Sequence, residues 1–244
     1  MNNTYQLEIC ANSVTSAARA QEGGADRVEL CQNLDIGGTT PSMGQIMAAR
    51  SILSIGLHVL IRPRGGDFLY SETEFTEMKL DILACRERKC DGVVVGMLQA
   101  DGRVDVARMK ELVEMAGPMQ ITFHRAFDCC RDPFEALETI IGLGCDRLLT
   151  SGMKETAEAG AETIAKLVEQ AAGRITVMAG AGIHEDNLER IAEVTGATAF
   201  HTSAKVRQVS NMNDADSAVG GMGDAVWVSS KEKIRRMADL IKTL

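Results

Sequence analysis

Short apolar, β-branched runs alternate along this chain with longer segments whose apolar residues recur at helical spacing. The pattern predicts eight strands, over residues 5–10, 27–31, 57–62, 92–96, 119–124, 146–150, 175–180 and 198–202. Eight strand and helix units in 244 residues predict an α/β protein that forms one closed parallel barrel, a (β/α)8 or TIM barrel. We therefore expect a single domain over residues 1–244.

The alternative fold is a doubly wound open sheet, which shows the same alternation of strands and helices. Such a sheet usually has fewer strands and a glycine-rich first turn, whereas the first turn here is Ala11-Asn12-Ser13. The expected helix starts are also well marked, by a capping box at Ser71 to Glu74 and by an N-cap with a first-turn proline at Asp132 to Glu135. A further capping box at Ser229 to Glu232 predicts that the chain closes with a C-terminal helix.

One long stretch without periodicity runs from about Arg207 to Val228. Structureless segments of this length in compact domains are usually lids over a site or disordered. We expect an irregular loop over 207–228, and the sequence leaves both alternatives open, a lid at the rim of the barrel or disorder.

The composition indicates a globular protein with an acidic surface. Apolar residues make up 45% of the chain and charged residues 25%, which suits one large core. With 26 basic against 34 acidic residues the net charge is −8, so we expect neither nucleic acid nor an anionic membrane as a partner. No apolar run approaches the roughly 20 residues that span a bilayer, and the N-terminus lacks the pattern of a signal segment. We expect a cytoplasmic protein whose seven scattered cysteines are mostly free thiols.

The predicted strands carry an unusual number of polar side chains on one face. Side chains alternate across a strand, so Glu8 and Cys10 point into the barrel while their apolar neighbours face the helices, and Glu29 and Cys31 repeat this pattern. Burying a charge costs several kcal/mol unless it is paired, so these charges form an ion-pair network or lie at a wet mouth. Functional groups of such barrels lie at the carboxyl ends of the strands, which here hold Glu8, Cys10, Glu29, Cys31, Arg62, His124, Thr150 and His201.

Polar residues nearer the strand starts are interpreted differently. Gln6, Arg27 and His58 face the same interior but lie away from the predicted mouth. We expect these three residues to be structural.

The loops at the predicted mouth favour an anionic ligand. Glycine-rich segments at 37–42 and 62–68 follow the second and third strands, and they suit either a loop that wraps a ligand or an ordinary tight turn. Arg62, Arg64 and Arg125 are expected to converge on this face, and guanidinium groups match the oxygens of carboxylate or phosphate. We therefore expect a small anionic ligand as one candidate partner.

Backbone and hydroxyl groups at the mouth are the candidate cofactor-binding groups. Gly180 and Gly182 follow the seventh strand, where the backbone N–H groups of such barrels often bind phosphate. Thr150 and Ser151 end the sixth strand and offer hydroxyl groups. We assign these four residues to the binding of an oxyanion.

Six motifs occur in one order within a stretch that runs from Tyr5 to about Met222. They are Glu-Ile-Cys at 8–10, Gly-Gly-Ala-Asp-Arg-Val-Glu-Leu-Cys at 23–31, Gly-Gly-Thr-Thr-Pro-Ser at 37–42, Ile-Arg-Pro-Arg-Gly-Gly-Asp-Phe at 61–68, Thr-Phe-His-Arg-Ala-Phe-Asp at 122–128 and Leu-Thr-Ser-Gly at 149–152. Together they resemble the CutC copper-homeostasis family. This resemblance implies a (β/α)8 barrel, a cytoplasmic homo-oligomer, for which we expect a homodimer, and a role in handling copper, but it implies no particular reaction.

The first functional hypothesis is copper binding. Cu(I) is a soft ion that prefers thiolate ligands, and Cys10 and Cys31 end neighbouring strands with their side chains pointing inward. The spacing permits a two-sulfur metal site, although free cysteines also serve as small buried apolar residues and the chain has no Cys-x-x-Cys motif. Following the resemblance, we predict a copper-homeostasis protein that binds a copper ion, as Cu(I), at the mouth of the barrel.

The alternative hypothesis is an enzyme that acts on a small anionic metabolite by acid/base chemistry. Glu8 or Glu29 then serves as the general base and His124 as the general acid. Arg62 and Arg125 clamp the carboxylate or phosphate of the substrate.

Two further polar residues complete this candidate catalytic set. Asp128 orients His124 or Arg125, or it caps the following loop, and His201 ends the eighth strand. The same charges also fit an internal layer of salt bridges. The sequence therefore leaves open whether the protein is an enzyme.

Overall fold

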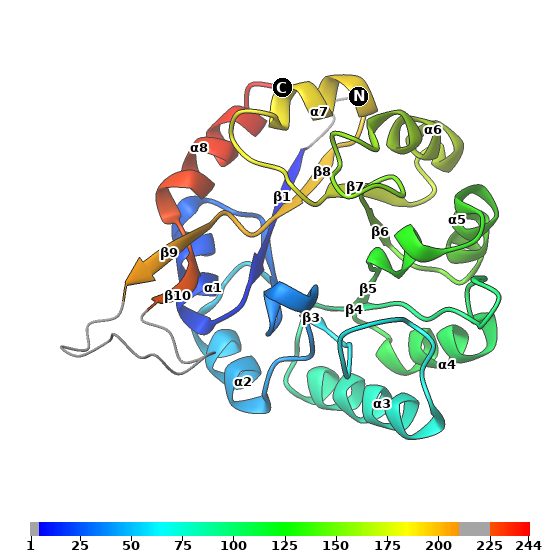
Figure 1. The fold of residues 1–244 in the computed structure, drawn as a ribbon. Coiled ribbons are helices and arrows are strands. Elements are labelled where there is room, and N and C mark those ends of the chain that lie inside the picture. Colours follow the sequence, from blue (N-terminus) through cyan, green and yellow to red (C-terminus); the bar gives the residue numbers. More distant parts are fainter. Residues whose placement is uncertain (1–4, 210–224) are drawn as a thin grey trace, which may run out of the picture.

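Eight parallel strands form a closed barrel surrounded by helices (Figure 1), which confirms the predicted (β/α)8 architecture. The computed structural model describes residues 5–209 and 225–244. The strands follow one another around the barrel in chain order, and β1 closes it by pairing with β8. They are β1 (Gln6–Ala11), β2 (Arg27–Leu30), β3 (Gly56–Leu60), β4 (Gly92–Val95), β5 (Gln120–Phe123), β6 (Arg147–Thr150), β7 (Thr176–Gly180) and β8 (Ala199–Thr202).

A ring of α-helices covers the outside of the barrel. These helices are α1 (Val14–Gly23), α2 (Met43–Ile52), α3 (Glu72–Glu87), α4 (Val106–Ala116), α5 (Pro133–Gly142), α6 (Ala161–Ala171), α7 (Leu188–Thr195) and α8 (Lys231–Ile241). Short 3-10 helices, η1 (Leu34–Ile36) and η2 (Arg125–Cys129), lie in the loops after β2 and β5. Across residues 5–209 and 225–244, none of the helices has the length and apolar content to cross a membrane.

The main apolar core lies between the strands and the helices. Leu7 and Ile9 of β1 are buried there in one cluster with Ile234 of α8. The alternate residues of the same strand, Glu8 and Cys10, are absent from this cluster, as the predicted alternation requires. Apolar burial against the helices therefore fixes which side chains of each strand face the barrel interior.

The predicted helix starts are present. Ser71 and Glu74 form a complete capping box at the start of α3, and Asp132 accepts hydrogen bonds from two backbone N–H groups at the start of α5. The C-terminal helix α8 begins one residue later than its motif indicates, because Ser230 rather than Ser229 supplies the cap. These caps fix where each helix begins relative to the strand before it.

The aperiodic range 207–228 is not irregular at its two ends. Strand β9 (Lys205–Val209) pairs antiparallel with β10 (Ala225–Ser229), and Ser229 of β10 donates from its backbone N–H to Ser16 of α1 at 3.0 Å. The prediction was wrong at these ends, because an exposed pair of strands needs no apolar alternation to form. Residues 210–224 lie outside the described residues, so the choice between lid and disorder stays a prediction.

The barrel interior contains a buried ion pair. Glu8 accepts a hydrogen bond from Nε of Arg27 at 2.5 Å, and the two side chains are 1% and 6% exposed. His58 is buried beside them, and its burial lowers the pKa of its ring to about 4. The ring fits because Gly92 has no side chain: a Cβ there would lie 2.4 Å from its Nδ1 and Cε1 atoms. The polar side chains inside the barrel, beneath its mouth, thus form a buried ion-pair network and are not exposed to solvent.

We predict that Glu8→Gln lowers the free energy of unfolding by about 3–5 kcal/mol, because it leaves the charge of Arg27 buried without its counter-ion. Urea unfolding followed by circular dichroism measures this loss. Glu162→Gln is the matched control, since Glu162 pairs with Lys166 on the exposed surface of α6, where ion pairs contribute little. Equal effects of the two substitutions would contradict a structural role for the Glu8 pair.

Candidate functional site

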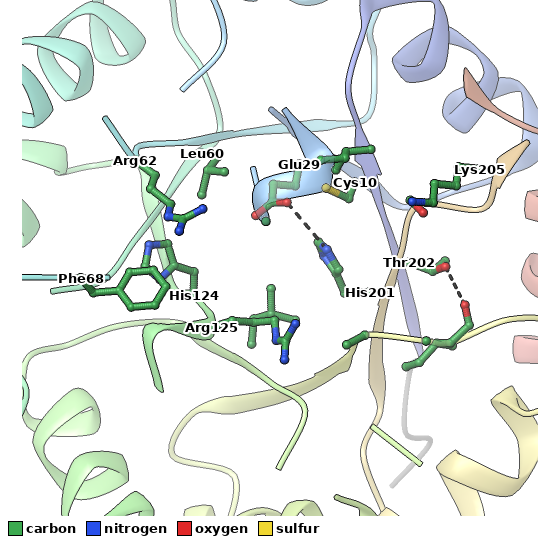
Figure 2. Close-up of a pocket in the computed structure, with 17 residues that line it drawn as sticks. Cys10, Glu29, Leu60, Arg62, Phe68, His124, Arg125, His201, Thr202 and Lys205 are labelled. Carbon is green, nitrogen blue, oxygen red and sulfur yellow. Dashed lines mark hydrogen bonds and ion pairs between the residues drawn. The ribbon is translucent and has the colours of Figure 1, made fainter. Parts of the chain in front are cut away.

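A cavity of about 460 Å³ opens at the carboxyl ends of the barrel strands (Figure 2). Its walls come from β1, β2, β3, β6 and β8 and from the loops that follow β2, β3, β5, β7 and β8. The predicted site residues that line it are Cys10, Glu29, Arg62, His124, Arg125, Gly182 and His201. The predicted residues that do not line it are Glu8, Cys31, Asp128, Thr150, Ser151 and Gly180.

Two cysteine sulfurs meet at one wall of this cavity. Cys10 ends β1 and Cys31 follows β2, and the parallel pairing of these strands brings their Sγ atoms to 3.3 Å. A carboxylate oxygen of Glu29 and both sulfurs all lie within 4.8 Å of one another. All three residues are buried, and Cys10 and Glu29 line the cavity. The predicted pair of cysteines therefore forms a compact donor group together with Glu29.

His201 bridges the buried ion pair and this donor group. Its Nδ1 atom lies 2.6 Å from Oε1 of Glu8, and its Nε2 atom lies 3.7 Å from Oε2 of Glu29. Burial opposes the charge of the ring, but Glu29, Cys10 and Glu8 outweigh it and raise the pKa of His201 well above its usual value. His201 is therefore an imidazolium at neutral pH.

The pKa values of Glu8 and Glu29 are shifted in opposite directions. Burial acts to raise the pKa of Glu8, but Arg27 and then His201 reverse this effect and lower it, so Glu8 is a carboxylate. For Glu29, burial dominates and raises the pKa of the carboxyl group, with His201 opposing it and the charge of Glu8 adding to it. Of the two predicted bases, only Glu29 lines the cavity, and Glu8 is held beneath it by Arg27.

The thiol of Cys10 keeps its proton in this environment. Its hydrogen bond with Cys31 contributes most, and burial and the neighbouring Glu29 add to it, so the pKa of Cys10 is raised well above its usual value. A metal ion that binds sulfur must displace this proton, because the ligand is the thiolate.

His124 is a neutral hydrogen-bond donor at the cavity wall. Its Nδ1 atom accepts from the backbone N–H of Ala126 at 3.1 Å, so the ring proton is on Nε2. The Nε2 atom is buried and has no hydrogen-bond partner within the part of the chain that the structure describes. Burial, and then the charge of Arg62, lower the pKa of His124 to about 3. The general-acid role predicted for His124 requires an imidazolium, which this environment disfavours.

Arg62 holds the loops of the mouth together. Its Nη1 atom donates to the carbonyl oxygens of Ile36 and Gly38 at 2.9 and 2.7 Å, and its Nη2 atom donates to Gly66 at 2.9 Å. The guanidinium also lies over the ring of Phe68, at 5.0 Å from its centroid. Three loop carbonyls therefore use donors of both Nη atoms that the predicted substrate clamp needs, while the buried Nε atom has no partner among the described residues.

Arg64 does not converge on the cavity, so the expectation that three arginines meet there was wrong. Its Nε atom donates to Glu74 at the start of α3, at 2.5 Å, and its Nη2 atom lies 3.0 Å from Asp67. Acidic partners next to the 62–68 loop draw the side chain toward the outer surface.

Asp128 anchors the loop after β6 and orients Arg125. It accepts from Thr150 Oγ1 at 2.5 Å, from Ser151 Oγ at 2.9 Å and from Nε of Arg125 at 2.8 Å. Of the alternatives open in the sequence, the geometry therefore supports contact with Arg125 and with the loop. The hydroxyl groups of Thr150 and Ser151 are used within this cluster, so they are not directed at a ligand.

The two candidate glycines after β7 differ in position. Gly180 packs against its neighbours, since a Cβ there would lie 2.5 Å from Cδ1 of Leu149. Gly182 lines the cavity, and it and Ala181 have positive φ angles of 72° and 74°. Only Gly182 is thus placed to meet a ligand.

Sequence reasoning missed Lys205, which lines the cavity from the start of β9. Its Nζ atom lies 5.0 Å from the centroid of the Trp227 ring on β10. No motif marks this lysine, because its place depends on how β9 leaves the barrel after β8.

The seven cysteines are free, as expected.

Comparison with known proteins shows the family to which this chain belongs. The sequence profile of the CutC family matches residues 5–206. A CutC family protein of Chromobacterium violaceum is 54% identical over 214 residues, which cover 88% of this chain and 87% of that protein. The copper homeostasis protein cutC homolog of Homo sapiens is 46% identical over 240 residues, which cover 98% and 87%. The crystal structure of CutC from Streptococcus agalactiae aligns with a TM-score of 0.78 at 34% identity, over 82% of this chain and 98% of that one.

We predict that His201 stabilises the fold most at acidic to neutral pH. Because folding raises its pKa, its contribution is fully present below the unfolded value of about 6.5 and is lost as the pH rises through the folded value. Urea unfolding of the wild type and of His201→Gln at several pH values measures this: the difference in stability shrinks as the pH rises above neutrality.

Nitrogen chemical shifts of the two rings test the same assignment directly. At pH 7, His201 should show two protonated ring nitrogens and His124 should show one. A His201 ring that titrates near the ordinary pKa of about 6.5 would contradict the network.

Proposed function

Because the chain belongs to the CutC family, we propose that it is a copper-homeostasis protein that binds a copper ion, as Cu(I), at Cys10 and Cys31. The observation that carries the proposal is the 3.3 Å separation of the two sulfurs at the edge of an accessible cavity. Thiolate sulfur is the ligand that selects Cu(I) over harder metal ions. The name of the human relative supports the link to copper.

The charges around the sulfurs suit a monovalent ion. Two thiolates with one Cu(I) carry a net charge of −1, and the imidazolium of His201 lies beside them to offset it. A buried group of charges is stable only when it is paired in this way. His201 therefore favours the loaded state without being a ligand itself.

Glu29 supplies the route for the proton that copper displaces. Its carboxyl group contacts Cys10, and its raised pKa gives it a higher affinity for a proton than an ordinary glutamate. Binding of Cu(I) by both thiolates releases two protons. Each can pass in turn to Glu29, which lies within 4.8 Å of both sulfurs, and from Glu29 through the cavity to solvent. Glu29 is thus a proton acceptor in metal binding, rather than the general base of a reaction on substrate.

The proposal includes a compartment and an assembly state. We place the protein in the cytoplasm, where reducing conditions keep thiols available for metal. We also propose that it acts as a homodimer. The cytoplasmic location rests on the family resemblance and on the free cysteines. The homodimer rests on the family resemblance alone, and gel filtration with light scattering tests it.

We predict that Cys10→Ser and Cys31→Ser, singly or together, lower the affinity for Cu(I) at least about tenfold, because each substitution removes a soft ligand. Competition with a chromophoric Cu(I) chelator under anaerobic, reducing conditions measures the change. Cys129→Ser is the control, since this cysteine is exposed and belongs to η2 after β5 rather than to the pair on β1 and β2. Unchanged stoichiometric binding in the double variant would overturn the site.

We also predict that Cu(I) affinity rises with pH. The raised pKa of Cys10 means that its proton must leave when the metal binds, and each proton released makes the affinity increase about tenfold per pH unit below that pKa. The same competition, repeated between pH 6 and pH 8 with the chelator's own pH dependence subtracted, measures the slope. A pH-independent affinity would show that the metal does not displace the thiol protons.

A further inference from the structure

The cavity is larger than one metal ion requires. Its volume of about 460 Å³ falls within the range of small-molecule sites. Its walls include a set of apolar side chains that make no contribution to a metal site, namely Leu34, Leu60, Phe68, Leu149 and Ile183. Such surfaces suit the carbon skeleton of an organic ligand.

A buried donor of the wall has no protein partner. His124 lines the cavity and is 4% exposed, and its buried Nε2 atom has no acceptor among residues 5–209 and 225–244. A buried N–H group without an acceptor is costly. An oxygen atom of a ligand would satisfy it.

Arg125, the next residue along the chain, presents a second donor on another part of the cavity wall (Figure 2). Asp128 and Ser151 hold its Nε and Nη2 atoms at 2.8 and 2.7 Å, while Nη1 has no acceptor in the described part of the chain. The guanidinium is thus fixed in orientation, with its side chain 42% exposed. A fixed guanidinium with a free edge is a typical ligand for carboxylate or phosphate.

The backbone after β7 adds further donors. Gly182 and Ile183 both line the cavity, and neither of their N–H groups donates to an acceptor in the described ranges. The positive φ angles of Ala181 and Gly182, 74° and 72°, keep the chain in a tight turn at this point. Successive free N–H groups in such a turn favour an anion.

The charged residues that line the cavity are mostly positive, which also favours an anion. Arg62, Arg125 and Lys205 carry positive charge, against a single acidic residue, Glu29, among the described residues that line the cavity. This excess occurs in a protein whose net charge is −8. A local positive potential in an acidic protein concentrates anions at the cavity.

We propose that this cavity binds a small organic oxyanion, a carboxylate or a phosphate ester, whose oxygens are held by His124, Arg125 and the backbone of Gly182 and Ile183. The apolar walls receive its carbon skeleton. This site goes beyond copper binding, because none of its donors is a sulfur atom. It places the organic anion in the same cavity as Cys10.

Isothermal titration calorimetry of the metal-free protein with phenyl phosphate and with benzoate tests the proposal. The two probes share an apolar ring and differ in the acid group, so their relative affinities show which oxyanion the site takes. Saturable binding of at least one probe at one site per chain is expected. Absence of saturable binding by both would overturn the proposal.

Variants assign the binding to the named donors. Arg125→Gln should weaken binding at least about tenfold, because a hydrogen bond to a charged group is lost. Arg131→Gln is the matched control, since Arg131 pairs with Glu135 on the surface. Equal affinity in these two variants would overturn the role of Arg125, and circular dichroism confirms that both are folded.

Two substitutions of His124 test its Nε2 donor separately from its Nδ1 acceptor. In His124→Asn the amide oxygen can still accept from Ala126 but the Nε2 donor is lost, so binding should weaken about tenfold. His124→Gln restores a donor near that position and should retain binding. Equal weakening by both would overturn His124 as a ligand to the anion. The titrations use metal-free protein, and neither His124 nor Arg125 is a proposed copper ligand, so their outcome is independent of copper binding.

Discussion

The buried carboxylate of Glu8 joins the ion pair inside the barrel to the charged groups at its mouth. Arg27 and His201 hold it ionised inside the barrel, and in return it helps to hold His201 as an imidazolium. That cation lies next to Glu29 and Cys10, where it opposes the rise in the pKa of Glu29 that burial causes. Buried charges persist only as mutually paired sets, and here one such set extends from the start of the strands to the functional face.

The cavity above this network has two chemically distinct parts. One part offers two thiols and a carboxyl group with a raised pKa, a set that suits a soft cation and the transfer of its displaced proton. The other offers a neutral imidazole N–H and a half-exposed guanidinium, a set that suits oxygen atoms. The positively charged ring of His201 lies beside the first part, and its charge also helps the second part to attract anions.

Several polar residues of the mouth are structural rather than reactive. Arg62 joins the loops after β2 and β3, and Asp128 joins the loop after β6 to Arg125. Both residues therefore shape the walls of the cavity, and their own donors and acceptors are largely saturated. A reaction by general acid/base catalysis would have to rely on Glu29 and His201, because Glu8 does not line the cavity and His124 is neutral.

The sequence by itself determined the barrel and seven of the residues that line its cavity. Strand alternation and helix caps are local signals, so β1 to β8 fall within one or two residues of their predicted ranges, and strand ends such as Cys10 and Glu29 meet at one mouth because parallel strands of a barrel end on the same face. Tertiary structure alone decided the protonation of His201, the loop contacts that use Arg62, and the outward turn of Arg64. Each of these depends on a partner supplied by a separate segment, such as Glu8 for His201 and Glu74 for Arg64, and local sequence patterns do not specify such pairings.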